Sequence, residues 1–113
     1  MIGKSKYGAK LTVVDGITFA SKREAIRYAI LKQKERVGMI SKLELQPRFP
    51  IVIDCSQVRY PNTNRPLSYV ADFSYIENGA RVIEDVKGMD TPLSKFKRAI
   101  VEHIYRIKIE IVK

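Results

Sequence analysis

Glu84, Asp85 and Lys87 stand at the end of an otherwise apolar, strand-like run, RVIEDVKG (residues 81–88). Charged side chains cost free energy to bury unless they are paired. Acids and a lysine crowded at a strand end therefore form either a solvated rim or the working part of a site. The elements around this run must decide between these two interpretations.

A β-hairpin is predicted where Asn78-Gly79 separates two apolar runs, residues 67–76 and 80–88. Asn-Gly favours a two-residue turn because both turn positions need positive φ. With that turn, residue 77 pairs with residue 80, and each later pair moves one residue outward on both strands. The register therefore places Asp72 directly opposite Asp85.

Residues that oppose each other in an antiparallel pair project to the same face, with Cβ atoms about 5 Å apart. Because side chains alternate along a strand, Lys87, opposite Val70, is expected on the face that Asp72 and Asp85 share. Glu84 points to the other face. There it is a bystander, or at most a partner for a basic side chain.

Two carboxylates roughly 5 Å apart repel by about 3 kcal/mol at an effective dielectric near 20. A divalent cation between Asp72 and Asp85 removes this repulsion, and Mg²⁺ suits hard oxygen ligands. Lys87 can then orient an attacking water or neutralise the charge at a phosphorus centre. The open alternative is that one aspartate lies beyond the sheet and Lys87 only forms a surface ion pair, as a one-residue register error would also allow.

The elements on the N-terminal side are a hairpin and a helix. Asp15-Gly16 predicts a second tight turn, so residues 11–19 form a hairpin. Ser21 to Glu24 matches a capping box and begins a helix that ends near Val37, before Gly38. The apolar side of this helix is expected to contain Ile26, Ile30 and Val37.

On the C-terminal side, short strands are predicted at 43–46 and 49–53, followed by a polar loop at 57–66. Thr91 and Pro92 can begin a helix over 91–105, and IKIEIV (107–112) alternates as a strand. The apolar stripe of that helix is expected to contain Leu93, Phe96, Ile100 and Ile104. The fold class is α/β with a mixed α+β sheet: a helix, three strands, a helix and a strand, preceded by the N-terminal hairpin.

The composition fits one compact domain with a nucleic-acid partner. The chain has 113 residues and a net charge of +9, which concentrates polyanions such as DNA. Residues 1–10 are expected to be a flexible basic arm and residues 11–113 a single domain. No apolar run approaches a membrane span and MIGKSKYGAK has no signal-peptide core, so we expect a cytoplasmic protein without a membrane partner. Cys55 is expected to be a buried small hydrophobe.

The pattern Asp72, then Asp85-Val86-Lys87, resembles the PD-(D/E)XK nuclease superfamily, in which an acid on one strand precedes (D/E)-x-K on the next. The core of that superfamily is restriction-endonuclease-like, αβββαβ, and residues 21–112 can be laid over it. Five strings more closely resemble a family of small phage-encoded proteins of uncharacterised function, related to phage Holliday-junction resolvases: KYGAK, VDGITFASKREA, LELQPRF, YVADFSY and EDVKG. The sequence departs from the superfamily pattern at Ala71, the residue before Asp72, where the superfamily's name has proline.

The resemblance implies Mg²⁺-dependent hydrolysis of DNA phosphodiesters, with Mn²⁺ as a substitute and no small-molecule organic cofactor. It implies that Asp72 and Asp85 are metal ligands and that Lys87 is the catalytic lysine. Many members place a helix glutamate at the metal, and Glu24 is the matching position, although its place in the capping box also explains it. Gln46 is a candidate for the margin of the site.

DNA contacts are expected from five lysines: Lys4, Lys6, Lys10, Lys95 and Lys97. The function expected is an endonuclease for branched, recombination or replication DNA in a phage context, acting in the host cytoplasm. A homodimer would supply two sites for two strands. Two alternatives remain: a non-catalytic DNA-binding accessory of recombination or packaging, and a transposase-like subunit that cleaves DNA ends.

Overall fold

A computed structural model describes residues 11–113 of the protein. The predicted basic arm, with Lys4, Lys6 and Lys10, lies outside the described residues. The described elements are, in chain order, β1 (Thr12–Val14), β2 (Ile17–Phe19), α1 (Lys22–Arg36), β3 (Ser41–Leu45), β4 (Arg48–Pro50), β5 (Val52–Ile53), β6 (Ser56–Gln57), β7 (Ser68–Val70), β8 (Phe73–Glu77), β9 (Ala80–Val86), α2 (Pro92–Tyr105) and β10 (Ile109–Val112).

The central feature is a four-stranded mixed sheet with the order β10-β9-β8-β3. β8 is antiparallel to both β3 and β9, and β10 is parallel to β9. The β1–β2 hairpin precedes α1, and the core follows the order α1, β3, β8, β9, α2, β10. The predicted mixed α+β class, the αβββαβ order and the N-terminal hairpin are therefore confirmed.

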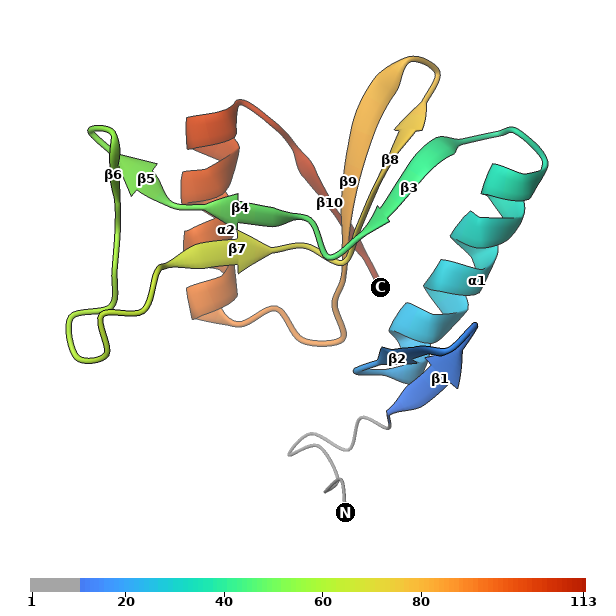
Figure 1. The fold of residues 1–113 in the computed structure, drawn as a ribbon, viewed down its shortest axis with the longest axis horizontal. Coiled ribbons are helices and arrows are strands. Elements are labelled where there is room, and N and C mark those ends of the chain that lie inside the picture. Colours follow the sequence, from blue (N-terminus) through green and yellow to red (C-terminus); the bar gives the residue numbers. More distant parts are fainter. Residues whose placement is uncertain (1–10) are drawn as a thin grey trace.

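The sheet separates two hydrophobic clusters, with α1 on one side and α2 on the other (Figure 1). Alternate residues of β9 enter different clusters because successive side chains of a strand point to opposite faces. Val82 and Val86 pack on the α1 side, whereas Ile83 packs on the α2 side. The short β4–β7 pair covers the α2 side with β4's Phe49 and β7's Tyr69. The two faces of β9 therefore have separate environments.

Both predicted hairpin turns are confirmed. Asp15 and Gly16 have φ of 52° and 75°, and Asn78 and Gly79 have φ of 52° and 78°, which is the positive-φ pair that such turns need. The β8–β9 register runs from residue 77 opposite residue 80 to Phe73 opposite Glu84, as expected.

The apolar run 67–76 is not one strand, contrary to the prediction. β7 pairs with β4 outside the central sheet, and the chain bends at Ala71-Asp72 before β8 begins. Val70 therefore opposes Arg48 rather than Lys87, and Lys87 lies one residue past the end of β9. The physical reason is that a strand can turn a corner between two sheets where its backbone hydrogen bonds change partner. Here the Ala71 N–H donates to Pro47 O at 3.0 Å, while the Asp72 N–H donates to Glu84 O at 3.0 Å.

The prediction of which residues form the apolar, core-facing side of α1 is wrong. Ile26, Ile30 and Val37 are exposed, with 51%, 44% and 61% of their surface accessible. The helix instead buries Ala25, Tyr28 and Leu31. Apolar residues occur all around this helix, so their spacing alone does not select a face. The buried pairing of α1's Arg27 with Glu84 fixes which side meets the sheet.

The expected stripe of α2 is only half correct. Ile100 and Ile104 pack against the core beside the fully buried Val101, but Leu93 and Phe96 are exposed. The Thr91 cap is confirmed, because its hydroxyl accepts a hydrogen bond from the Ser94 N–H at 3.1 Å.

Two further observations complete the fold. Cys55 is exposed, contrary to expectation, because it lies with Asp54 in the positive-φ turn between β5 and β6. No helix within residues 11–113 is long and apolar enough to cross a membrane.

Candidate active site

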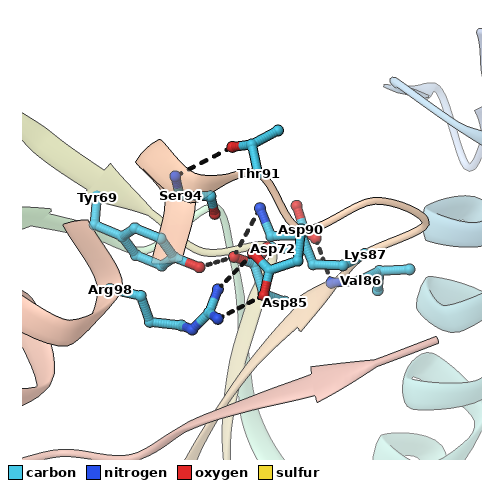
Figure 2. A network of polar contacts seen from close by, with 9 residues as sticks. All are labelled: Tyr69, Asp72, Asp85, Val86, Lys87, Asp90, Thr91, Ser94 and Arg98. Carbon is cyan, nitrogen blue, oxygen red and sulfur yellow. Dashed lines mark hydrogen bonds and ion pairs between the residues drawn. The ribbon is translucent and has the colours of Figure 1, made fainter. Parts of the chain in front are cut away.

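Asp72 and Asp85 meet where β8 begins and β9 ends (Figure 2). Asp85 is only 2% exposed, and Asp72 is half-buried. The Val86 N–H donates to Asp72 Oδ2 at 2.7 Å, and the Asp72 N–H bonds to the carbonyl of Glu84. Asp72 is thus fixed to β9 on both sides of Asp85. These two residues are called the paired aspartates below.

The pKa values of both paired aspartates are raised, so their ionised forms are disfavoured. Burial raises the pKa of Asp72 to about 6 against the lowering effects of Asp85 and of the Val86 N–H, and the nearby Glu24 carboxylate adds to the rise. Burial and then the neighbouring Asp72 raise the pKa of Asp85 to about 6, against the opposing effects of Tyr69 and Lys87. Both shifts have the sign expected when carboxylates share a poorly solvated site, so a cation or a proton between them is favoured.

Lys87 joins this site although it lies beyond the strand. Its Nζ is 3.4 Å from Asp85 Oδ2, and its side chain is 23% exposed. Its N–H donates to Val112 O of β10 at 2.9 Å, which fixes the backbone at this point. The alternative raised from the sequence, an ion pair between Lys87 and one aspartate, is therefore present. It lies at the paired aspartates rather than away from them.

Glu24 and Gln46 line a pocket with Asp72. The pocket has a volume of about 160 Å³, and its other walls are β2, Leu45 of β3 and Phe73 of β8. Glu24 Oε2 accepts a hydrogen bond from the Ala20 N–H at 3.2 Å, and the Glu24 N–H donates to Ser21 Oγ at 3.2 Å. Glu24 is thus a helix cap and a neighbour of the paired aspartates at once.

Gln46 reaches this pocket through an unusual backbone conformation. Its φ is 52°, at the point where the chain leaves β3, and its N–H donates to Asp72 O at 2.9 Å. The structure therefore brings Glu24 and Gln46 to Asp72, and Asp72 in turn lies beside Asp85, which pairs with Lys87.

Lys95 and Lys97 lie on the first turns of α2. Lys95 is exposed and Lys97 is half-buried. Arg98 chiefly lowers the pKa of Asp90, but Lys87 and Lys95 contribute, so both lysines lie in the neighbourhood of Asp90.

Sequence reasoning missed Tyr69 and Arg98 as parts of the site. The buried Tyr69 donates its hydroxyl hydrogen bond to Asp85 Oδ2, and Lys87 Nζ lies 6.0 Å from the centre of its ring. Arg98 makes two hydrogen bonds to Asp90, of 3.0 and 2.6 Å, and lies beside the Tyr69 hydroxyl. The one available signal was that a buried tyrosine needs a partner for its hydroxyl. No spacing rule pairs Arg98 with an acid eight residues away across a loop.

Glu84 lies on the opposite face, as expected. It is 3% exposed and accepts hydrogen bonds from Arg27 Nε and Nη2 at 2.8 and 2.6 Å, and from the Tyr75 hydroxyl. Burial by itself would raise the pKa of Glu84, but the bonds from Arg27 and Tyr75 hold that pKa below its ordinary value. The predicted basic partner on the far face is therefore Arg27.

The donor set around the paired aspartates consists of oxygen atoms. Within residues 11–113, no group of three or more Asp, Glu, His or Cys side chains is arranged so that it could hold a metal ion, and Glu24 therefore does not form a three-carboxylate site with the paired aspartates. Mg²⁺ commonly uses only one or two carboxylates and completes its octahedron with waters and substrate phosphates. Asp72 and Asp85 fit such an open site.

Comparison with known proteins places the chain in a family. Its sequence matches the family described as "Protein of unknown function (DUF1064)" over residues 4–113. No curated protein and no solved structure matches it. Because the match spans nearly the whole chain, the protein belongs to the DUF1064 family.

Proposed function

We propose that the protein is a Mg²⁺-dependent endonuclease that hydrolyses phosphodiester bonds of DNA, built on the PD-(D/E)XK plan. One observation carries the proposal: Asp72 lies beside Asp85, with Lys87 two residues further on, at the end of the central strand pair of an αβββαβ sheet. A buried and a half-buried carboxylate side by side, both with raised pKa values, are unfavourable for stability alone. Their free-energy cost is explained if they hold a cation for chemistry.

The residues have distinct roles in this proposal. Asp72 and Asp85 would hold Mg²⁺ or Mn²⁺, which when bound supplies Lewis-acid polarisation of the phosphate and a more acidic water. The Lys87 ammonium, 3.4 Å from Asp85, provides a positive charge close to the place where the phosphate gains negative charge. Gln46 lines the pocket with Asp72, and in the proposal its amide positions a water or a phosphate oxygen.

DNA binding is supported by charge. The net charge of +9 favours a polyanion, and Lys95 lies in the neighbourhood of Asp90, as does Lys87. In the proposal Lys95 and Lys97 contact the DNA backbone, together with Lys4, Lys6 and Lys10. The resemblance to phage Holliday-junction resolvases favours branched recombination or replication intermediates in the host cytoplasm, cut by a homodimer that presents two sites.

The test is a cleavage assay with Mg²⁺ or Mn²⁺ on branched, duplex and single-stranded DNA. Wild type is compared with Asp85→Ala and with Asp54→Asn, a matched acid substitution in the exposed β5–β6 turn, where asparagine tolerates the positive φ. We expect wild type and Asp54→Asn to cleave and Asp85→Ala to be inactive. The proposal is wrong if no substrate is cleaved with either metal, or if Asp85→Ala cleaves as well as wild type.

The same assay separates the two alternatives. Binding of DNA without cleavage would favour a non-catalytic accessory of recombination or packaging. Cleavage that requires a second protein would favour a transposase-like subunit.

A further inference from the structure

Each of the paired aspartates has one carboxylate oxygen already held by the chain. Asp72 Oδ2 accepts the hydrogen bond of 2.7 Å from the Val86 N–H. Asp85 Oδ2 accepts the hydroxyl of Tyr69 and lies 3.4 Å from Lys87 Nζ. In the part of the chain that the structure describes, Oδ1 of either aspartate accepts no hydrogen bond from an N–H or hydroxyl donor. The pair therefore offers one oxygen from each side chain that no N–H or hydroxyl holds, while the two carboxyl groups contact each other and Asp72 also contacts Glu24.

The two Oδ2 contacts differ in kind. The Val86 N–H belongs to the backbone of β9, so any sequence with this fold would supply it. The Tyr69 hydroxyl comes from a side chain of β7, outside the central sheet. Tyr69 is therefore the contact that this particular sequence adds to the site.

Tyr69 is well placed to hold Asp85 rigidly. Its side chain is 3% exposed and packs among residues of the α2-side cluster, so its ring has little freedom. Arg98 of α2 lies beside its hydroxyl (Figure 2). Because a guanidinium has donors and no acceptor, the hydroxyl proton remains available for Asp85. The Lys87 ammonium, 6.0 Å from the ring centre, is oriented by the same residue.

We propose that Tyr69 is a positioning residue that limits Asp85 to ligation through a single oxygen, and so makes the paired aspartates prefer Mg²⁺ over Ca²⁺. The inference rests on the proposed function, because it takes the paired aspartates to be a cation site. Its physical basis is coordination number. Mg²⁺ demands a small octahedron, whereas Ca²⁺ takes six to eight oxygens and readily uses both oxygens of a carboxylate. The hydrogen bond from Tyr69 uses one lone pair of Asp85 Oδ2 and fixes the orientation of the carboxylate, which favours ligation of the first ion through Oδ1 and disfavours the two-oxygen ligation that suits the second.

The test compares Tyr69→Phe with Tyr75→Phe in the full chain without DNA. The two substitutions are matched, because each removes a buried hydroxyl that donates to a buried carboxylate on β9, on opposite faces of the sheet. Calorimetric titration with Mg²⁺ and with Ca²⁺ gives both affinities. Circular dichroism in EDTA shows whether each variant is folded.

We expect Tyr69→Phe to weaken Mg²⁺ binding about 10-fold, the lower end of the range for groups that orient a metal ligand, and Ca²⁺ binding by less than about 3-fold. Tyr75→Phe should leave both affinities unchanged. An unaltered ratio of the two affinities in Tyr69→Phe would overturn the inference, as would an equal change of ratio in Tyr75→Phe. If Tyr69→Phe does not fold, Arg98→Lys takes its place, because it alters the guanidinium beside the Tyr69 hydroxyl. This substitution should lower the ratio of Mg²⁺ affinity to Ca²⁺ affinity by a smaller factor. An unchanged ratio in Arg98→Lys would then overturn the inference.

Failure of this inference can be told apart from failure of the proposed function. Wild type that binds Mg²⁺ but cleaves no DNA would refute the nuclease proposal and leave the assignment of Tyr69 standing. Wild type that cleaves DNA while Tyr69→Phe keeps the original cation preference would refute only the assignment of Tyr69. Wild type that binds neither cation in this titration overturns the assignment, and the cleavage assay then decides the function separately.

Discussion

Glu84 and Asp85 are adjacent acids on β9, and their pKa values are shifted in opposite directions. Both are buried, with 3% and 2% of their surface exposed, and each accepts a hydrogen bond from a tyrosine hydroxyl. Glu84 faces the two-point hydrogen bonds of Arg27. Asp85 faces a second acid, Asp72, with a single lysine nearby.

The difference teaches how one strand can place two adjacent acids in opposite electrostatic environments. The pKa of Glu84 is lowered because its full counter-charge outweighs its burial, so it is ionised and stabilising at neutral pH. The pKa of Asp85 is raised to about 6 because burial and Asp72 outweigh Tyr69 and Lys87. The alternation of a β-strand allows this contrast, since neighbouring residues lie in separate layers.

The largest expected effect is on cleavage. Asp72→Asn keeps an oxygen that can accept the Val86 N–H but removes one charge from the pair, so we expect cleavage to fall about 100- to 1,000-fold, as for loss of one preorganised electrostatic group. The measurement is the single-turnover rate with saturating Mg²⁺. Retention of more than about a tenth of the wild-type rate would show that the pair is not the reactive site.

The next effect concerns stability on the opposite face. Arg27→Ala leaves Glu84 buried without its counter-charge, and we expect the free energy of unfolding to fall by about 3 kcal/mol. Urea unfolding measures this loss, and Arg27→Met combined with Glu84→Gln should recover part of it by removing the orphaned charge. A loss below about 1 kcal/mol for Arg27→Ala would mean that Glu84 is not the structural member of the comparison.

A smaller effect of opposite sign is expected at the paired aspartates. A folded-state pKa of about 6 lies above the ordinary value of 3.8, so the folded protein binds this proton more tightly and loses stability as pH rises from about 4 to about 6. Asp72→Asn removes that loss. At pH 7.5, without added metal, the free energy of unfolding of the Asp72→Asn variant should exceed that of wild type by about 1–2 kcal/mol, given about 1.4 kcal/mol per pKa unit.

The control for this stability prediction is pH itself. The gain from Asp72→Asn should shrink towards zero near pH 4, where the wild-type aspartate is protonated. A gain that is equally large at pH 4 and 7.5 would show that the substitution acts through packing rather than charge.

The smallest effect concerns DNA affinity. We expect DNA binding to weaken about 3-fold in each of two variants, Lys95→Ala and Lys97→Ala. If each variant loses one phosphate contact, the magnitude of the slope of log affinity against log salt should fall by about 0.9. Lys108→Ala, exposed in the loop before β10, is the control. Equal losses in all three variants would indicate a general effect of net charge rather than contacts near the site.

Much of the site was predictable because its geometry follows from local rules. The Asn78-Gly79 turn needs positive φ, and that turn sets the pairing of β8 with β9. The register in turn places Asp72 at the level of Asp85 and sends Glu84 to the far face. The start of α1 at Ser21 and of α2 at Thr91 likewise follows from capping by side chains a few residues away.

The tertiary structure alone decided what these residues meet. Residues 67–76 contain no proline or glycine, and apolar residues stand on both sides of Asp72, so their pattern does not mark the corner at which the chain leaves β7 for β8. The partners Arg27 for Glu84 and Tyr69 for Asp85 are 57 and 16 residues away from them in the chain. Turns, caps and register depend on backbone sterics and hydrogen bonds between near neighbours, which sequence specifies directly. The charge balance of a buried acid depends on which distant layer packs against it, and that is settled only when the helices close on the two faces of the sheet.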